Sequence, residues 1–288
     1  MNDESTEVSC LSISRLALKK GIQSRGGFIH PKDMAESSFD EDKFSLYTYA
    51  QLVETSYIGI PPSSLGTLFD YLLRTEMYIS SGVETMDAIM NSFFTSVKGA
   101  TRVNEFDKVR DLMINLYDCY NRKKENYRKI VSLAVQLVRY DTAFRSGYFD
   151  PNEKPYKVAE EEASIIDYML KATQIYLMTH EKITRLGVSF NAIGAKNCAP
   201  SDADLLGEDA LIDIKLIRKE PTSQHTLQLL LYYIMGLHEY HDEFVGVKYL
   251  KVLNPRKGKI YSYDIAKIDI DTLKHVEKNI MGYNESVF

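Results

Sequence analysis

The sequence predicts an α/β protein in which a block of helices precedes a β-rich core. Two patterns carry this prediction. Apolar residues recur every three or four positions through much of residues 75–180, which is typical of amphipathic helices. After residue 183 apolar and polar residues alternate at a period of two, which is typical of strands. We therefore expect a central mixed β-sheet flanked by helices, with a large helical insertion ahead of the sheet.

The helical part is expected to begin after the Pro61-Pro62 break, because prolines often precede or open a helix. An apolar stretch follows at 65–74. Four-residue spacing of apolar side chains predicts helices around 112–120 and 130–138. Pro151 and Pro155 end this block, and residues 158–180 predict one more amphipathic helix.

The β-rich part is expected to follow the order β-β-β-α-β-β-α. The first three strands are predicted at 183–193, 202–206 and 210–217, and a helix at 222–238 follows them. Two further strands, at 244–253 and 259–265, are joined by a turn that contains Asn254, Pro255 and Gly258. A last helix is predicted at 270–281.

Length and composition limit the class of protein. The chain has 288 residues, of which 44% are hydrophobic and 26% charged, as in ordinary globular proteins. The 15 glycines and 8 prolines are too few for a collagenous or low-complexity chain. We expect residues 1–45 to form a lead-in with a short helix near 11–20. Residues 46–288 should form a single domain, with a helical insertion at 75–180 and the β-rich core at 183–288.

Charge and cysteine content suggest the compartment and the partners. A net charge of −5 argues against binding polyanions over the whole surface, but it permits an acidic metal site. The three cysteines lie far apart and none forms a CxxC motif, so a reducing cytoplasm is expected. The acidic N-terminus does not resemble a secretory signal, and the most apolar stretch, 227–237, is too short to span a bilayer. We expect a cytoplasmic protein without a membrane segment.

Residues 201–215 carry the residues best suited to chemistry. They predict a hairpin with Asp204 on its first strand, a turn at Gly207-Glu208-Asp209, and Asp213 and Lys215 on its second strand. Residues two apart on a strand share a face, so Asp213 and Lys215 should point the same way while the aliphatic residues between them point into a core.

Two converging carboxylates beside an ammonium suit metal-assisted hydrolysis of a phosphodiester. Mg²⁺ and Mn²⁺ prefer oxygen ligands, and two carboxylates repel each other unless a cation lies between them. The metal polarises the phosphoryl oxygen and lowers the pKa of a bound water, which the ammonium can orient. We assign Asp204 and Asp213 as metal ligands and Lys215 as the group that orients the water.

These motifs resemble those of the PD-(D/E)XK nuclease superfamily, particularly its RecB-like nucleases. The resemblance covers roughly residues 185–265 and rests on Asp204, on Asp213-Ile214-Lys215, and on the segment from Gln228 to Tyr232, QLLLY. Upstream, residues 66–72, GTLFDYL, are similar to that family's first helix motif, with Asp70 at the position of a metal-binding histidine.

The resemblance implies a restriction-endonuclease-like fold and cleavage of DNA with Mg²⁺ or Mn²⁺. The metal ligands that it implies are Asp70, Asp204, Asp213 and the backbone carbonyl of Ile214. Gln228 and Tyr232 are implied to support Lys215. The iron–sulfur cluster of some relatives is not expected, because it needs four cysteines and the chain has three.

Other interpretations stay open for these residues. Asp213 and Lys215 also fit a solvent-facing pair on an edge strand. Asp202 competes with Asp204 as a ligand, and Gln228 and Tyr232 fit an ordinary amphipathic helix.

The first-motif acid and the activity are open as well. Asp70 also fits the surface of a helix, and the first-motif acid can instead be Glu160, Glu161 or Glu162. The alternative function is a catalytically inactive module of nuclease fold that binds nucleic acid or a partner protein, and the helical insertion offers a surface for such a partner.

Overall fold

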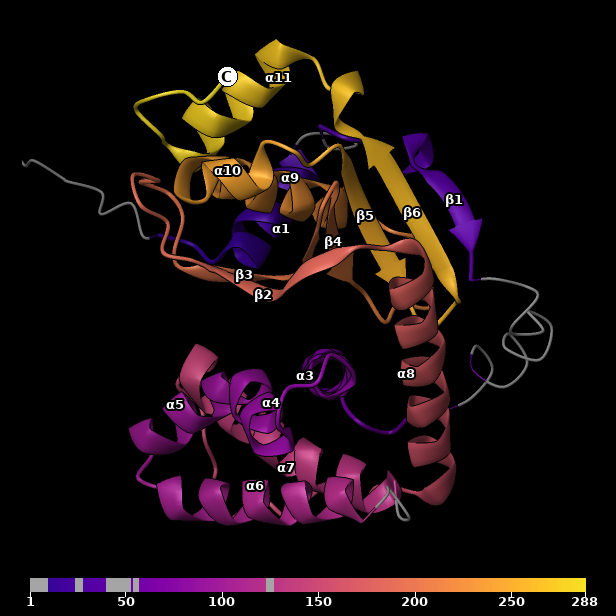
Figure 1. Ribbon diagram of the computed structural model, residues 1–288. Coiled ribbons are helices and arrows are strands. Elements are labelled where there is room, and N and C mark those ends of the chain that lie inside the picture. The colour runs from indigo at the N-terminus through magenta and orange to yellow at the C-terminus, as the bar shows by residue number, and fades with distance from the viewer. Residues whose placement is uncertain (1–9, 24–27, 40–52, 54–56, 123–126) are drawn as a thin grey trace, which may run out of the picture. The chain divides into compact units, whose positions relative to one another are not determined.

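The computed structural model describes residues 10–23, 28–39, 53, 57–122 and 127–288 and divides the chain into two compact units (Figure 1). Unit 1 comprises Met1–Ser38, Leu177–Asn254 and Lys259–Phe288, and unit 2 comprises Phe39–Tyr176 and Pro255–Gly258. Of the predicted lead-in, residues 1–9, 24–27 and 40–45 lie outside the described residues.

Unit 1 is built on a mixed sheet whose described strands number six, in the order β1-β6-β5-β4-β3-β2. The strands are β1 (Ala35–Ser38), β2 (Ile183–Phe190), β3 (Ser201–Gly207), β4 (Ala210–Ile214), β5 (Tyr249–Asn254) and β6 (Lys259–Asp264). β4 and β5 are parallel, and the other neighbouring strands are antiparallel. A parallel pair needs a crossover connection, which the helix α9 (Ser223–Glu239) supplies.

α9 is the central helix of unit 1, and every residue from Thr226 to Leu237 is buried. It contacts α1 (Ile13–Gln23), α10 (His241–Phe244) and the strands β2, β4 and β5. Gly236 lets α10 approach, because a Cβ at this position would lie 2.1 Å from the Phe244 ring. The C-terminal part continues with α11 (Ile270–His275) and a π-helical turn, Val276–Met281.

Unit 2 is helical in the part that the structure describes. Its helices are α3 (Pro62–Ser80), α4 (Thr85–Ser92), α5 (Phe94–Arg102), α6 (Phe106–Asn121), α7 (Tyr127–Ser146) and α8 (Glu160–His180), and the unit boundary falls within α8. Pro62 opens α3, where the missing N–H of proline costs nothing. α5 and α7 cross closely, since a Cβ on Gly99 would lie 1.8 Å from the carbonyl oxygen of Tyr140.

The predicted α/β class and the mixed sheet with flanking helices are confirmed, and the predicted helix at 11–20 corresponds to α1. Three details of the prediction were wrong. β1 was not predicted. The strand predicted at 244–253 is β5, which begins only at Tyr249, because residues 241–244 form the helix α10. β4 ends at Ile214 instead of residue 217. No helix in the described ranges has the length and apolar character needed to cross a membrane.

Candidate functional site

The β3–β4 hairpin brings two carboxylates to one end of β4. Leu205 pairs with Ile212, and the same register continued by one residue places Asp204 opposite Asp213. The pairing of β3 with β4 ends at Leu205 and Ile212. Beyond it, the Asp204 side chain accepts a hydrogen bond from the backbone N–H of Ile214 at 2.7 Å. The predicted hairpin with Asp204 and Asp213 on facing strands is therefore present.

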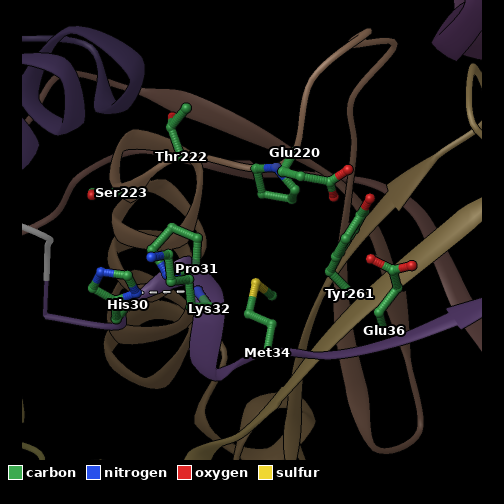
Figure 2. A pocket seen from close by; sticks show the side chains of 10 residues that line it. His30, Pro31, Lys32, Met34, Glu36, Glu220, Thr222, Ser223 and Tyr261 are labelled. Carbon is green, nitrogen blue, oxygen red and sulfur yellow. Dashed lines mark hydrogen bonds between the residues drawn. The ribbon is translucent and has the colours of Figure 1, made fainter.

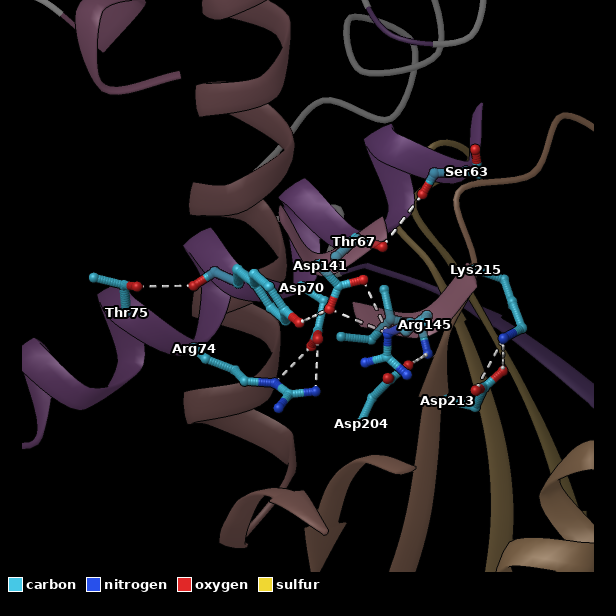
Figure 3. A network of polar contacts seen from close by, with 12 residues as sticks. Ser63, Thr67, Asp70, Arg74, Thr75, Asp141, Arg145, Asp204, Asp213 and Lys215 are labelled. Atoms are coloured by element: carbon cyan, nitrogen blue, oxygen red, sulfur yellow. Dashed lines mark hydrogen bonds and ion pairs between the residues drawn. The ribbon is translucent and has the colours of Figure 1, made fainter. Parts of the chain in front are cut away.

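Asp213 is buried on a central strand and is paired with Lys215. β4 lies between β3 and β5, all its residues are buried, and Asp213 is 2% exposed. The two carboxylate oxygens of Asp213 lie 3.0 and 2.7 Å from Lys215 Nζ (Figure 3). A buried carboxylate requires such a partner, because removing a charge from water is costly. The interpretation of this pair as solvent-facing residues on an edge strand is wrong.

The surroundings of Asp213 change its acidity. Burial raises the pKa of the Asp213 carboxyl to about 6, the Lys215 ammonium works in the opposite direction, and the Asp204 carboxylate raises the pKa further. Asp204 and Asp213 therefore repel each other across the hairpin. A cation shared by the two carboxylates would relieve this repulsion.

Gln228 and Tyr232 face the same region from α9. Gln228 Nε2 donates to the Tyr232 hydroxyl at 3.0 Å, and both side chains are buried. Gln228 Nε2 also lies 3.2 Å from Ser14 Oγ of α1. Burial raises the pKa of Tyr232, and the Asp213 carboxylate raises it further, so the hydroxyl stays protonated. The Tyr232 ring stacks on Phe190 of β2, with ring centroids 5.9 Å apart, which fixes its position.

Two more polar residues belong to this environment. Asp202, the competitor of Asp204, contributes to the raised pKa of Tyr232. His225, which the sequence motifs did not assign, has its pKa lowered to about 4 by burial and by the Lys215 ammonium. Its Nδ1 accepts a hydrogen bond from the N–H of Thr222 at 3.1 Å, which caps α9. The Thr-x-x-His spacing at the start of a predicted helix was the signal for this cap.

Asp70 belongs to unit 2, in α3, whereas the other predicted site residues belong to unit 1. Its carboxylate forms an ion pair with Arg74, with Arg74 Nη2 2.6 Å from Asp70 Oδ2 and a second contact at 2.8 Å (Figure 3). A metal-binding role for Asp70 stays a prediction.

Of the three candidate glutamates at the start of α8, Glu160 and Glu161 are exposed and Glu162 is buried. Glu162 accepts hydrogen bonds from the Tyr156 hydroxyl and from the backbone N–H groups of Gly59 and Ala159. Glu160 lies 3.7 Å from Arg128 in an exposed ion pair. The bonds of Glu162 to Ala159 and Gly59 satisfy backbone donors around the first turn of α8, which is a structural role for this carboxylate.

The described residues contain no group of three or more His, Cys, Asp and Glu side chains that could hold a metal ion by themselves. Within unit 1 the candidate ligands are thus two carboxylates, Asp204 and Asp213, together with backbone oxygen. In comparisons with known proteins, no family model, curated protein or solved structure matches the chain.

Proposed function

We propose that the chain is a Mg²⁺- or Mn²⁺-dependent nuclease that hydrolyses DNA phosphodiesters. The observation that carries the proposal is the convergence of Asp204, Asp213 and Lys215 at the end of β4. The raised pKa of Asp213 supports it, because strongly shifted carboxyls are frequent at functional sites. A restriction-endonuclease-like fold and kinship with RecB-like nucleases are part of the same proposal, which the motif order and the α9 crossover support.

The donor set suits a hard divalent cation. Asp204, Asp213 and the carbonyl oxygen of Ile214, all of unit 1, would hold the ion. When bound, the ion supplies a polarised phosphoryl oxygen and a water of lowered pKa. The two carboxylates supply the charge that retains the ion.

Lys215 has the central role among the groups of the chain itself. Its ammonium donates to Asp213 and can donate in addition to the attacking water, which it would orient in line with the leaving oxygen. As the bond from water oxygen to phosphorus forms and the bond to the leaving oxygen breaks, the ammonium stabilises the charge on the non-bridging oxygens. The products are a phosphomonoester and a free hydroxyl, whose oxygen takes up the proton that the attacking water loses.

The α9 residues position these groups without reacting. The Tyr232 hydroxyl, which accepts a hydrogen bond from Gln228, stays protonated because burial and the Asp213 carboxylate raise its pKa. His225 is neutral at pH 7, so Lys215 is not opposed by a second positive charge on this ring.

A cleavage assay tests the proposal. Purified chain is incubated with linear, circular and single-stranded DNA in Mg²⁺, in Mn²⁺ and in EDTA. We expect cleavage only with metal, and Lys215→Ala should lower the rate by about 100-fold or more. Lys182→Ala is the matched control, because Lys182 is an exposed lysine of unit 1 paired with Glu208. A Lys215→Ala variant that cleaves at the wild-type rate would refute the assignment.

A second candidate function is binding without cleavage, as a nuclease-like module that holds nucleic acid or a partner protein. The ion pair of Asp70 with Arg74 favours this candidate, because it engages the carboxylate proposed as a ligand. Titration calorimetry with Mn²⁺ separates the two. Heat of binding at one site supports the nuclease, whereas no binding at millimolar Mn²⁺ together with intact DNA supports the module.

A further inference from the structure

Unit 1 has a pocket of about 510 Å³ beside the first turn of α9 (Figure 2). Three parts of unit 1 line it: residues 30–36, which lead into β1; residues 220–223, which lead into α9; and Tyr261 of β6. Sites for small organic molecules typically measure about 300–1,000 Å³. The pocket is therefore large enough for one nucleotide.

The sheet register relates this pocket to the candidate active site. Asp213 pairs with Val252, Val252 with Tyr261, and Tyr261 with Glu36. Paired residues on neighbouring strands point to the same face, so Asp213, Tyr261 and Glu36 belong to one row of one face. β4 and β6 are two strand spacings apart, which is about 10 Å. Neighbouring nucleotides of one strand can span that distance.

The chemistry of the lining changes from one end of the pocket to the other. In Figure 2, His30 and Ser223 lie at one end, Glu220 and Tyr261 at the other, and Met34 lies between them. His30 Nδ1 accepts a hydrogen bond from the backbone N–H of Lys32 at 3.1 Å. In the neutral ring, Nε2 is therefore the donor.

Each part of the lining matches one part of a nucleotide. His30 and the exposed cation Lys32 lie at the same end of the pocket. Their N–H donors suit a phosphate group. Met34 offers an apolar surface to the face of a base. At the acidic end Glu220 and Glu36, the latter paired with Lys259, can accept hydrogen bonds from base amino groups or from a sugar hydroxyl.

We infer that this pocket binds one unpaired nucleotide of the substrate strand, next to the nucleotide whose phosphate meets Asp213. The inference rests on the proposed nuclease function and adds the substrate class, a strand with at least one unpaired base near the cut. A base inside a duplex cannot enter a pocket without leaving its stack and its partner.

Binding of short single-stranded DNA in Ca²⁺, without cleavage, tests the inference on the full chain. One abasic site is placed at each position of the oligonucleotide in turn, and affinity is followed by fluorescence anisotropy. Loss of one stacked base costs about 1–3 kcal/mol, so one position should weaken binding about tenfold or more. Lys32→Glu should weaken binding and remove the dependence of affinity on the abasic position. Lys182 does not line the pocket, so the control variant Lys182→Glu should keep this position dependence.

The outcomes separate this inference from the proposed function. Equal affinity for every abasic position, or equal affinity for a blunt duplex, overturns the inference even if the chain cleaves DNA in Mg²⁺. Position-dependent binding without cleavage in Mg²⁺ or Mn²⁺ overturns the proposed function and leaves the nucleotide pocket standing.

Discussion

Asp213→Asn should change how the stability of unit 1 depends on pH. Burial raises the pKa of the Asp213 carboxyl from 3.8 to about 6 in the folded protein, so the folded state holds this proton more tightly than the unfolded state. Stability from this group is fully present below pH 3.8 and is lost as the pH rises to about 6. At about 1.4 kcal/mol per pKa unit, the loss is on the order of 3 kcal/mol.

The assay is equilibrium urea unfolding in EDTA from pH 4 to pH 8, followed by circular dichroism and tyrosine fluorescence. The free energy of unfolding of the wild type minus that of Asp213→Asn should fall by about 2 kcal/mol between pH 4 and pH 7. Taking this difference between the two pH values cancels the effects of the substitution that do not depend on pH. Asp209→Asn, which changes an exposed carboxyl in the same hairpin, is the control variant. A flat difference for Asp213→Asn would refute the account of its burial.

Two further predictions concern the packing around the site and in unit 2. Tyr232→Phe removes the hydroxyl that accepts from Gln228, so urea unfolding should show a loss of about 1–2 kcal/mol; an unchanged midpoint would contradict this bond. Gly99→Ala places a Cβ 1.8 Å from the Tyr140 carbonyl oxygen and should cost about 1–3 kcal/mol or prevent folding of unit 2. Gly66→Ala, with no atom within 4 Å, should instead stabilise α3 by about 0.5–1 kcal/mol. Thermal melts that rank these two glycine variants in the reverse order would be inconsistent with the structure.

The sequence predicted the elements whose signal is local. The hairpin follows from the Gly207-Glu208-Asp209 turn between two short apolar runs, and Asp204 and Asp213 follow from their positions in it. α9 follows from its long apolar run and its Thr222 cap. In these segments the local sequence pattern agrees with the fold, so the pattern alone was sufficient.

Elements that depend on distant partners were missed. β1, with the sequence AESS, has no apolar alternation, and all four of its residues are exposed. It is a strand because it pairs with β6, far along the chain. The predicted strand 244–253 began too early, because residues 241–244 form a short helix against α9, where the Phe244 ring fills the space that Gly236 leaves.

The environment of the site residues was also beyond the sequence. The period-two pattern of β4 suggested a half-exposed strand, whereas all five of its residues are buried, and burial raises the pKa of Asp213. His225 was not assigned because its lowered pKa depends on its own burial and on the Lys215 ammonium. The ion pair between Asp70 and Arg74 on α3, in contrast, follows the four-residue spacing that brings side chains together on one face of a helix.

Binding of Mn²⁺ to the full chain tests most directly whether Asp204 and Asp213 hold a divalent ion. Electron paramagnetic resonance of a Mn²⁺ titration counts the bound ions for the wild type and for an Asp204→Asn, Asp213→Asn double variant, with Asp209→Asn as control. We predict one site in the wild type and in the control that is lost in the double variant. Equal Mn²⁺ binding by the wild type and the double variant would contradict the proposed centre.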